Sequence, residues 1–477
     1  MNRAAVAAAA CLVLAPVFAE GLPDLGDVSQ TVLSPIAERK LGEEIMREIR
    51  ADPSYVDEPE LTDYLNAIGS RLAQASPDSK RAFEFFAIQD NSVNAFALPG
   101  GFIGVHTGTL LISQTESELA SVLSHEIGHV VQHHMSRMIA NQEKTQMVSL
   151  AALAAAILVA RSNSQASQAI AAGSQAVAVQ SQLNFTRDNE READRVGVQI
   201  LERSKFDVHA MPVFFERLQR STRFVEGSAP SYLRTHPLPF ERIADIQNRT
   251  QNLPYRQVPD GLVFQMLRAR LRAEQDSARD AITYFEDMLA QRKFTFEAAA
   301  RYGLATARLR DKDYTGARRE LEALRRLVPE SPMVDTFAAR LLNAAGDGAG
   351  ALAAYRAGLV RHPEYRALVY GYIDTLLATK NPAEALAVVE QQQQLRPQDA
   401  QLYLLQARGY AAQGKQLLQH RAQAEAYARQ GDVRAAIEQL QIALRAGDGD
   451  FYQLSIAEAR LRELRAQDPE SAKRERR

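Results

Sequence analysis

Hydrophobic residues follow a helical spacing along most of the chain. From about Ser34 to Ala75 they recur every three or four residues, which predicts amphipathic helices. The pattern then changes, because residues 83–88 and 93–105 are rich in aromatic and β-branched side chains around Pro99-Gly100-Gly101. Such a composition predicts β-strands joined by a turn.

The segments that follow return to a helical pattern. Ser113 and Glu116 form a capping-box pattern, which predicts the start of a long helix that runs to about Gln142. Residues 147–180 are rich in Ala, Ser and Gln. Packing helices are the first interpretation of this segment, and a mobile lid or an element in peripheral membrane contact is the alternative. A further helix is predicted from about Asp188.

The last part of the chain repeats itself. Prolines and alanines recur with a period of 34 residues, which is typical of tetratricopeptide repeats, each a pair of antiparallel helices. The next interval, from Ala385 to Ala436, is 51 residues long and predicts an insertion of half a repeat. We expect four or five units within residues 262–465, after a turn-rich boundary at 252–261. The periodic residues are Pro329, Pro363, Pro397, Ala317, Ala351 and Ala385.

Length and charge limit the classes of protein that remain. A chain of 477 residues is long enough for two or three domains, and a formal net charge of −2 gives no basic excess for binding nucleic acid. We expect a first domain over residues 20–254, the repeat domain over 262–465, and a charged, solvated tail over 466–477.

The first 19 residues predict a cleavable signal peptide. Arg3 precedes an apolar segment that runs from Ala4 to Val17, and Val17-Phe18-Ala19 matches a small-residue cleavage pattern. The one cysteine, Cys11, lies in this segment, so the mature chain would have no disulfide and no cysteine metal ligand. A lipid anchor on Cys11 is the alternative. The longest later apolar run is too short to span a bilayer, so we expect an exported soluble protein, in the periplasm if the cell has an outer membrane.

The segment His125-Glu126-Ile127-Gly128-His129 carries the pattern H-E-x-x-H within the long predicted helix. A helix turns by about 100° per residue, so His125 and His129 share a face and can bind one metal ion. Glu126 then lies beside the open position of the metal, where a carboxylate can accept a proton from bound water. The pattern also occurs by chance in unrelated helices, so its significance depends on a third ligand.

A later helix offers that ligand. The metzincin pattern is excluded, because Gln132 and Met135 stand where glycine and histidine would be required. Glu190 and Asp194 are four residues apart and share a helical face, whereas Glu192 points away. We therefore assign Glu190 as the third ligand of one Zn²⁺ per chain, and Asp194 as the carboxylate that orients a zinc-binding histidine. A solvated, acidic helix start is the alternative.

Four motifs together resemble peptidase family M48. They are the H-E-x-x-H helix, Glu190-x-x-Ala193-Asp194, Asn94-Ala95-Phe96-Ala97-Leu98-Pro99-Gly100-Gly101 and Thr235-His236-Pro237. A signal peptide and carboxy-terminal tetratricopeptide repeats resemble the periplasmic members of that family. The similarity covers nearly all of the mature chain, and its motifs are specific in the protease half and generic in the repeats.

The resemblance implies a mainly α-helical fold: a gluzincin-type metalloprotease domain with a small β-sheet, followed by a tetratricopeptide superhelix. Asn94, Ala95 and Phe96 would belong to an edge strand that holds an extended substrate. The implied partners are unfolded or misassembled outer-membrane proteins and the β-barrel assembly machinery.

Two further residues are candidates for the site. In the family, a histidine in the matching Thr-His-Pro segment can occupy the fourth zinc position and hold the enzyme latent, so His236 is a candidate latch; a turn histidine is the alternative. Arg242 is a candidate for stabilising the oxyanion of the transition state, and a structural salt bridge is the alternative. His133 and His134 are expected to be structural, because His133 lies about 12 Å along the helix from His125.

We therefore predict a periplasmic zinc endopeptidase that degrades misfolded or stalled outer-membrane proteins and assists their assembly, with Glu126 as the general base. Two other functions stay open at this point. One is a chaperone or assembly adaptor that acts through its repeats while the zinc site is latent. The other is a zinc hydrolase that acts on cell-wall peptides.

Overall fold

The computed structural model describes residues 34–141, 187–222, 232–233, 236–237, 240–254 and 256–467. The expected signal peptide (1–19), the segment 147–180 and residues 468–477 of the expected tail lie outside the described residues. Among the helices that are described, none has the length and apolar character needed to cross a membrane.

A three-stranded sheet organises the first half of the chain. Its order is β1 (Glu84–Ile88), β3 (Phe102–His106) and β2 (Ala95–Leu98), with β1 parallel and β2 antiparallel to the central β3. The turn η1 (Pro99–Gly101) joins β2 to β3. Gly101 has a φ of 86°, and a Cβ at this position would lie 2.3 Å from a neighbouring backbone carbonyl, so the turn requires glycine there.

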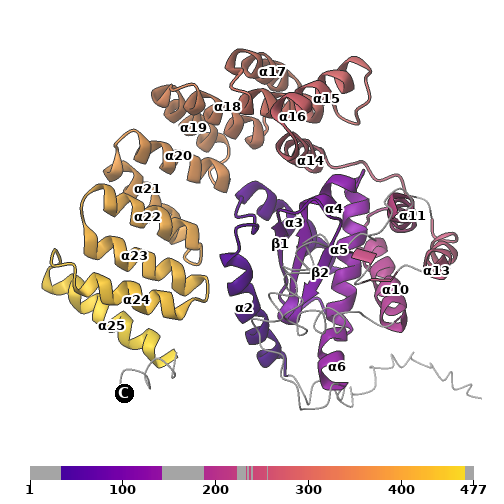
Figure 1. Ribbon diagram of the computed structural model, residues 1–477, viewed down its shortest axis with the longest axis horizontal. Coiled ribbons are helices and arrows are strands. Elements are labelled where there is room, and N and C mark those ends of the chain that lie inside the picture. The colour runs from indigo at the N-terminus through magenta and orange to yellow at the C-terminus, as the bar shows by residue number, and fades with distance from the viewer. Residues whose placement is uncertain are drawn as a thin grey trace, which may run out of the picture.

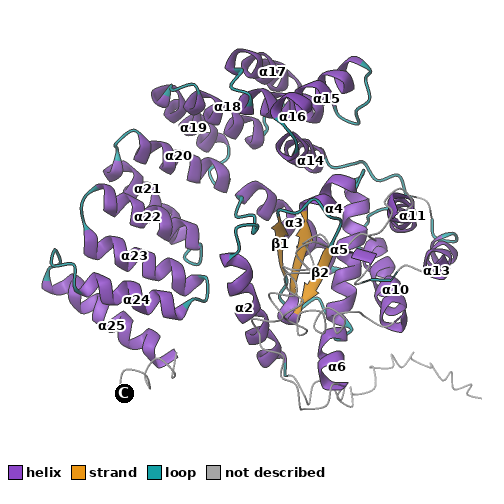
Figure 2. Cartoon of the chain, viewed as in Figure 1, coloured by secondary structure: helices purple, strands orange, loops and turns teal. Residues whose placement is uncertain are grey.

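Helices cover both faces of this sheet (Figure 2). On one face, Ile45 and Met46 of α2 (Pro35–Ala51) pack against Phe86 and Phe102. On the other face lie α3 (Pro59–Gln74) and α5 (Glu116–Val131). Because both faces are buried, the strands are almost continuously hydrophobic and do not alternate with polar residues.

Further helices complete this half. α10 and α11 pack against α5 on the side away from α2, and α13 packs against both α10 and α11. Their bounds, with those of the two short helices α4 and α6, are α4 (Thr107–Ile112), α6 (His134–Asn141), α10 (Arg187–Arg203), α11 (Ala210–Thr222) and α13 (Phe240–Thr250).

The start of the long predicted helix differs from the prediction. The helix α5 is capped by Thr115, whose hydroxyl accepts the N–H of Glu118 at 3.2 Å, and not by Ser113. The Glu118 carboxylate in turn accepts the N–H of Gln114 at 2.7 Å. The capping residues are therefore the pair Thr115 and Glu118, two residues later than the predicted pair Ser113 and Glu116.

The end of that helix also differs. α5 stops at Val131, and α6 begins only at His134, so the helix predicted to reach about residue 142 is two helices. Between them His133 adopts a left-handed φ of 54°, which the sequence does not indicate because no glycine marks the position. The break between the two helices lies just after His129.

The second half is an array of helices that curves around the α2 and α3 side of the first half (Figure 1). The periodic alanines Ala317, Ala351 and Ala385 are buried in the second helices of successive pairs. Ala436 lies on α24, so the longer interval before it corresponds to one additional helix. The array comprises α14 (Leu262–Gln275), α15 (Ala278–Ala290), α16 (Glu297–Arg310), α17 (Tyr314–Leu327), α18 (Pro332–Ala344), α19 (Gly348–Arg361), α20 (Arg366–Ala378), α21 (Pro382–Leu395), α22 (Ala400–Ala412), α23 (Gln416–Arg429), α24 (Val433–Leu444) and α25 (Phe451–Gln467). The predicted fold class, a helical domain with a small sheet followed by helical repeats, is confirmed.

Two separate parts of the array contact α3. Arg270 of α14 is buried and forms ion pairs with Glu58 and Glu60 at the start of α3. Near α20, the Tyr365 hydroxyl donates to Glu60 Oε1 at 3.0 Å, and Arg366 forms an ion pair with Asp63 of α3 at 2.6 Å. Burial, together with the neighbouring Glu58 and against the attraction of Arg270, raises the pKa of Glu60 to about 7.

Candidate metal centre

The helix α5 places two histidines on one buried face. The Nε2 atoms of His125 and His129 lie 3.1 Å apart, and both rings are almost completely buried. Gly128 lies between them, and a Cβ there would be 2.8 Å from the backbone oxygen of Ala193. The glycine therefore allows α10 to approach α5 closely enough for carboxylates on α10 to reach the two rings.

Two carboxylates on α10 face these rings. Glu190 Oε2 lies 3.4 Å from His125 Nε2, and Glu190 Oε1 lies 3.4 Å from His129 Nε2. One turn later, Asp194 Oδ1 lies 2.9 Å from the other ring nitrogen of His125, Nδ1. Glu192 contacts His134 and Arg137, away from this cluster. The structure thus brings together the residues that the sequence placed on one face of this helix.

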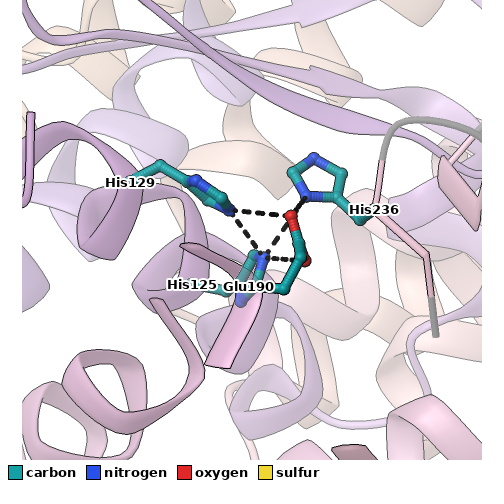
Figure 3. Close-up of side chains that lie close together, drawn as sticks. All are labelled: His125, His129, Glu190 and His236. Atoms are coloured by element: carbon teal, nitrogen blue, oxygen red, sulfur yellow. Dashed lines mark hydrogen bonds and ion pairs between the residues drawn. The ribbon is translucent and has the colours of Figure 1, made fainter. Parts of the chain in front are cut away.

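His236 completes a group of four. Its Nδ1 lies 3.0 Å from Glu190 Oε1 and 3.4 Å from His125 Nε2 (Figure 3). The ligand atoms of His125, His129, Glu190 and His236 all lie within 4.8 Å of one another, and each residue is buried. The ring of Tyr232 stacks on His236 with centroids 4.7 Å apart.

Arg242 contacts the carboxylates of both Glu190 and Asp194. Its Nε and Nη2 donate to the two oxygens of Asp194, both at 2.8 Å, and Nη1 lies 2.7 Å from Glu190 Oε2. Nη1 also donates to the backbone oxygen of Pro237 at 2.7 Å. Of the two alternatives for Arg242, this geometry favours the salt bridge, because each of these donors is engaged with the protein.

The donor distances fit a tetrahedral zinc ion. Ligand atoms at about 2.0–2.1 Å from a tetrahedral Zn²⁺ lie about 3.3 Å from one another. Separations between donor atoms of the cluster include 3.0 Å (His236 to Glu190), 3.1 Å (His125 to His129) and 3.4 Å (His125 to Glu190), and all four ligand atoms lie within 4.8 Å of one another. Two imidazole nitrogens and a carboxylate are the usual ligand set of zinc peptidases, so the residues present fit this metal.

Charge balance supports a divalent cation as well. The buried carboxylates of Glu126, Glu190 and Asp194 face one buried guanidinium, that of Arg242, which leaves two formal negative charges when all three acids are ionised. Buried charge needs compensation. Although burial lowers the pKa of His125, the carboxylates of Asp194 and Glu190 outweigh this effect and raise it to about 10. Zn²⁺ would supply the same compensation and requires the neutral ring.

Glu126 is oriented toward the cluster but is not held by it. Both of its carboxylate oxygens are buried without a hydrogen-bond partner among the described residues. His236 Nε2 lies 3.6 Å from Glu126 Oε1. Burial raises the pKa of Glu126, and the neighbouring His236 and His125 only partly oppose this.

His134, expected to be only structural, contacts the cluster through His129. Its Nδ1 lies 2.8 Å from His129 Nδ1, and its Nε2 lies 3.0 Å from Glu192 Oε2. When the His134 Nε2–H donates a hydrogen bond to Glu192, His134 Nδ1 can accept a hydrogen bond from the His129 Nδ1–H. The lone pair of His129 is then on Nε2, the atom that faces the metal site. The sequence concealed this contact, because His134 reaches His129 only through the left-handed turn at His133.

The strand β2 has one unpaired side among the described residues, near the cluster. Asn94 O accepts the N–H of His106 at 2.9 Å, so by antiparallel alternation the main-chain groups of Ala95 and Ala97 point away from β3. The main chain of Phe96 is hydrogen-bonded to β3. The side-chain Oδ1 of Asn94 is buried without a hydrogen-bond partner in the described part of the chain. Of the three predicted edge residues, Ala95 therefore offers its main chain.

Two family models match the chain. The model of peptidase family M48 matches residues 59–250, and a tetratricopeptide-repeat model matches residues 342–409. The protein named Beta-barrel assembly-enhancing protease from Yersinia pestis is 30% identical over 417 residues, which cover 87% of this chain and 86% of that protein. The chain belongs to peptidase family M48. The M48 match contains all four residues of the cluster.

Other M48 relatives cover less of their own length. The protein of the same name from Escherichia coli (strain K12) is 36% identical over 317 residues, 65% of this chain and 64% of that protein, so the chain matches just under two thirds of it. The Mitochondrial metalloendopeptidase OMA1 of Schizosaccharomyces pombe is 30% identical over 216 residues, 44% of this chain and 60% of the relative. The predicted family is confirmed, and this relative is named as a metalloendopeptidase.

Proposed function

We propose that this M48 protein is a periplasmic zinc-dependent endopeptidase that cleaves unfolded or misassembled outer-membrane proteins. The observation that carries the proposal is the buried cluster of His125, His129, Glu190 and His236, with the unbonded carboxylate of Glu126 beside it. Bound zinc would polarise the scissile carbonyl and acidify a water molecule. The ligands are His125, His129 and Glu190, as the sequence pattern indicates.

Glu126 is the general base in this proposal. Its carboxylate accepts a proton from the attacking water and passes it to the leaving amine. Burial raises the pKa of Glu126, which favours its protonated form relative to that of an exposed glutamate and suits a group that both takes and gives a proton. Asp194 holds His125 with Nε2 directed at the cluster, and Arg242 fixes Asp194 and Glu190 together.

An extended substrate pairs with the unpaired side of β2. The main-chain N–H and C=O groups of Ala95 and Ala97 supply the hydrogen bonds, as in other peptide-binding sheet edges. Main-chain pairing recognises any extended segment, so it favours unfolded chains over folded ones. Asn94 offers its unbonded side-chain oxygen to the same substrate.

His236 is a latch in this proposal. Its Nδ1 lies as close to Glu190 and His125 as a fourth ligand would, which is the place that a catalytic water needs. The backbone N–H of Tyr232 donates to Val93 O at 3.1 Å, directly before β2. Movement of Tyr232 together with His236 would therefore expose both the metal site and the end of β2 with which the substrate pairs.

The substrate class and location rest on similarity. The relatives from Escherichia coli and Yersinia pestis are named as enhancing β-barrel assembly, which supports outer-membrane proteins as substrates and the β-barrel assembly machinery as a partner. Tetratricopeptide repeats bind protein segments, and here they would select substrates for the protease half.

The test is degradation of a loosely folded outer-membrane protein by the purified chain loaded with zinc. We expect wild type to cleave it, Glu126→Gln to retain zinc but lose at least about 100-fold in rate, and His236→Ala to cleave faster. Glu202→Gln, on the exposed side of α10, is the matched control and should cleave like wild type. Normal cleavage by Glu126→Gln would refute the assigned mechanism. Absence of cleavage by every zinc-loaded variant would favour an adaptor that acts through its repeats.

A further inference from the structure

A second site lies where the helical array begins. A cavity of about 320 Å³ is enclosed by α14, α15, the loop that follows α15 and the start of α16, with Leu111 of α4 at one side. None of its lining residues belongs to the metal cluster. The volume is at the lower end of the range for ligand pockets, which suits one or two residues of a peptide.

Aromatic and aliphatic side chains form the wall. Phe285 of α15 is buried, whereas the neighbouring Tyr284 is 40% exposed to solvent. Phe294, Phe296 and Met288 complete the apolar lining. Such a surface favours a large apolar side chain.

The charged residues of the lining are all basic. They are Arg268, Arg272 and Lys293, and none of the described residues that line the cavity carries a carboxylate. Arg268 donates to two neutral acceptors, the backbone oxygen of Leu111 at 3.1 Å and Gln265 Oε1 at 3.4 Å, and forms no ion pair with the described residues. Burial lowers the pKa of Arg268, and the carboxylates of Glu118 and Asp260 only partly oppose this.

The charge of Arg272 is partly compensated by a carboxylate. It pairs with Asp276 at 3.2 Å near the surface, and its guanidinium lies over the Tyr284 ring, 5.0 Å from the centroid. The ring fixes the guanidinium at the mouth of the cavity. A carboxylate that enters the cavity would meet both Arg268 and Arg272, whose side chain is 39% exposed.

We propose that this cavity binds the free carboxyl terminus of a polypeptide whose last side chain is aromatic or large and aliphatic. In a terminal residue the carboxylate and the side chain share one Cα, which matches a small cavity that has a cation and an apolar wall. The carboxylate pairs with Arg268, and the side chain packs among the aromatic residues. This inference does not depend on hydrolysis, because binding can be measured in a chain that lacks the proposed general base.

The experiment measures fluorescence anisotropy of a labelled glycine-serine hexapeptide that ends in phenylalanine, titrated with full-length Glu126→Gln protein. The free acid should bind at least about tenfold more tightly than the C-terminal amide, and more tightly than the same peptide ending in serine. Arg268→Gln, added to this background, should weaken binding of the acid by about tenfold or more. Arg268→Lys, which keeps the charge, should retain part of the affinity.

Two further variants control for folding and for non-specific charge. Thr295→Glu places a carboxylate at the exposed mouth of the cavity without removing a buried group, and it should also abolish binding. Arg408→Gln removes an exposed arginine elsewhere in the array and should leave binding unchanged. Equal binding of acid and amide, or no effect of both Arg268→Gln and Thr295→Glu, would overturn the proposal. Equal binding of an amidated peptide with an internal glutamate would also overturn it, in favour of acidic segments.

Discussion

Replacing Asp194 with asparagine tests how the metal centre is oriented. The Asp194 carboxylate accepts from Arg242 through both oxygens at 2.8 Å, and one of these oxygens also lies 2.9 Å from His125 Nδ1. Asparagine keeps the shape but has one oxygen and one NH₂ group. If its oxygen faces the guanidinium, its NH₂ group faces His125 Nδ1 and favours the tautomer with a proton on Nε2. That tautomer cannot bind metal through Nε2.

The expected cost of Asp194→Asn is about 10–100-fold in zinc affinity, or about 1.4–2.7 kcal/mol, as for other carboxylates behind zinc-binding histidines. Competition with a coloured chelator measures this directly, and the rise in Tm on adding zinc gives an independent value. Asp188→Asn is the control, since Asp188 lies on the same helix with its side chain 92% exposed. Equal zinc affinity in Asp194→Asn and wild type would refute the reasoning.

Three other predictions follow from the structure. His134→Phe removes the nitrogen 2.8 Å from His129 and should lower zinc affinity by about tenfold, measured by the same competition; an unchanged affinity would show that the contact is only structural. Gly101→Ala should cost about 1–3 kcal/mol of unfolding free energy in urea, more than Gly346→Ala, which has a similar φ but open space around it; equal losses would contradict this. The pKa of Glu60 is raised to about 7 in the folded state, so the folded protein keeps a proton on Glu60 at pH values where the unfolded chain has already released it. The contribution of Glu60 to the free energy of unfolding is therefore fully present at low pH and is lost as the pH rises toward 7. Glu60→Gln should flatten the dependence of Tm on pH between 5 and 7, and an equally steep profile would argue against that pKa.

The parts of the site that the sequence predicted lie within single helices. His125 and His129 follow from helical spacing alone, and so do Glu190 and Asp194, because a helix fixes which residues share a face. The distance between the two pairs depends on Gly128, where the absence of a side chain allows α10 to approach. The sequence contains Gly128 but does not indicate that Ala193 of α10 packs against it.

The parts that were missed or left open depend on the path of the chain between helices. His236 returns to Glu190 from 46 residues away, and no periodicity encodes that return. His134 reaches His129 because His133 adopts a left-handed conformation without a glycine. For Arg242 two roles were open, and only its distances to Asp194 and Glu190 separate them.

The same difference applies to the repeats. The alanine period depends on local packing between paired helices, and it predicted the extra length before Ala436. The cavity around Arg268 combines two repeats with α4, so its residues share no spacing. Tertiary sites of this kind have no signature in one sequence.

The attachment of the array to α3 has a mechanical consequence. In an ordinary repeat protein each unit contacts only its neighbours, so the curvature of the superhelix can change without breaking other contacts. Here α14 and α20 are both tied to α3, through Arg270 at one point and through Tyr365 and Arg366 at the other. The helices between these points and α3 form a closed ring, whose curvature cannot change unless one of the two attachments breaks. A load on that arc is therefore transmitted to α3, and from α3 to the sheet and the helix that carries His125.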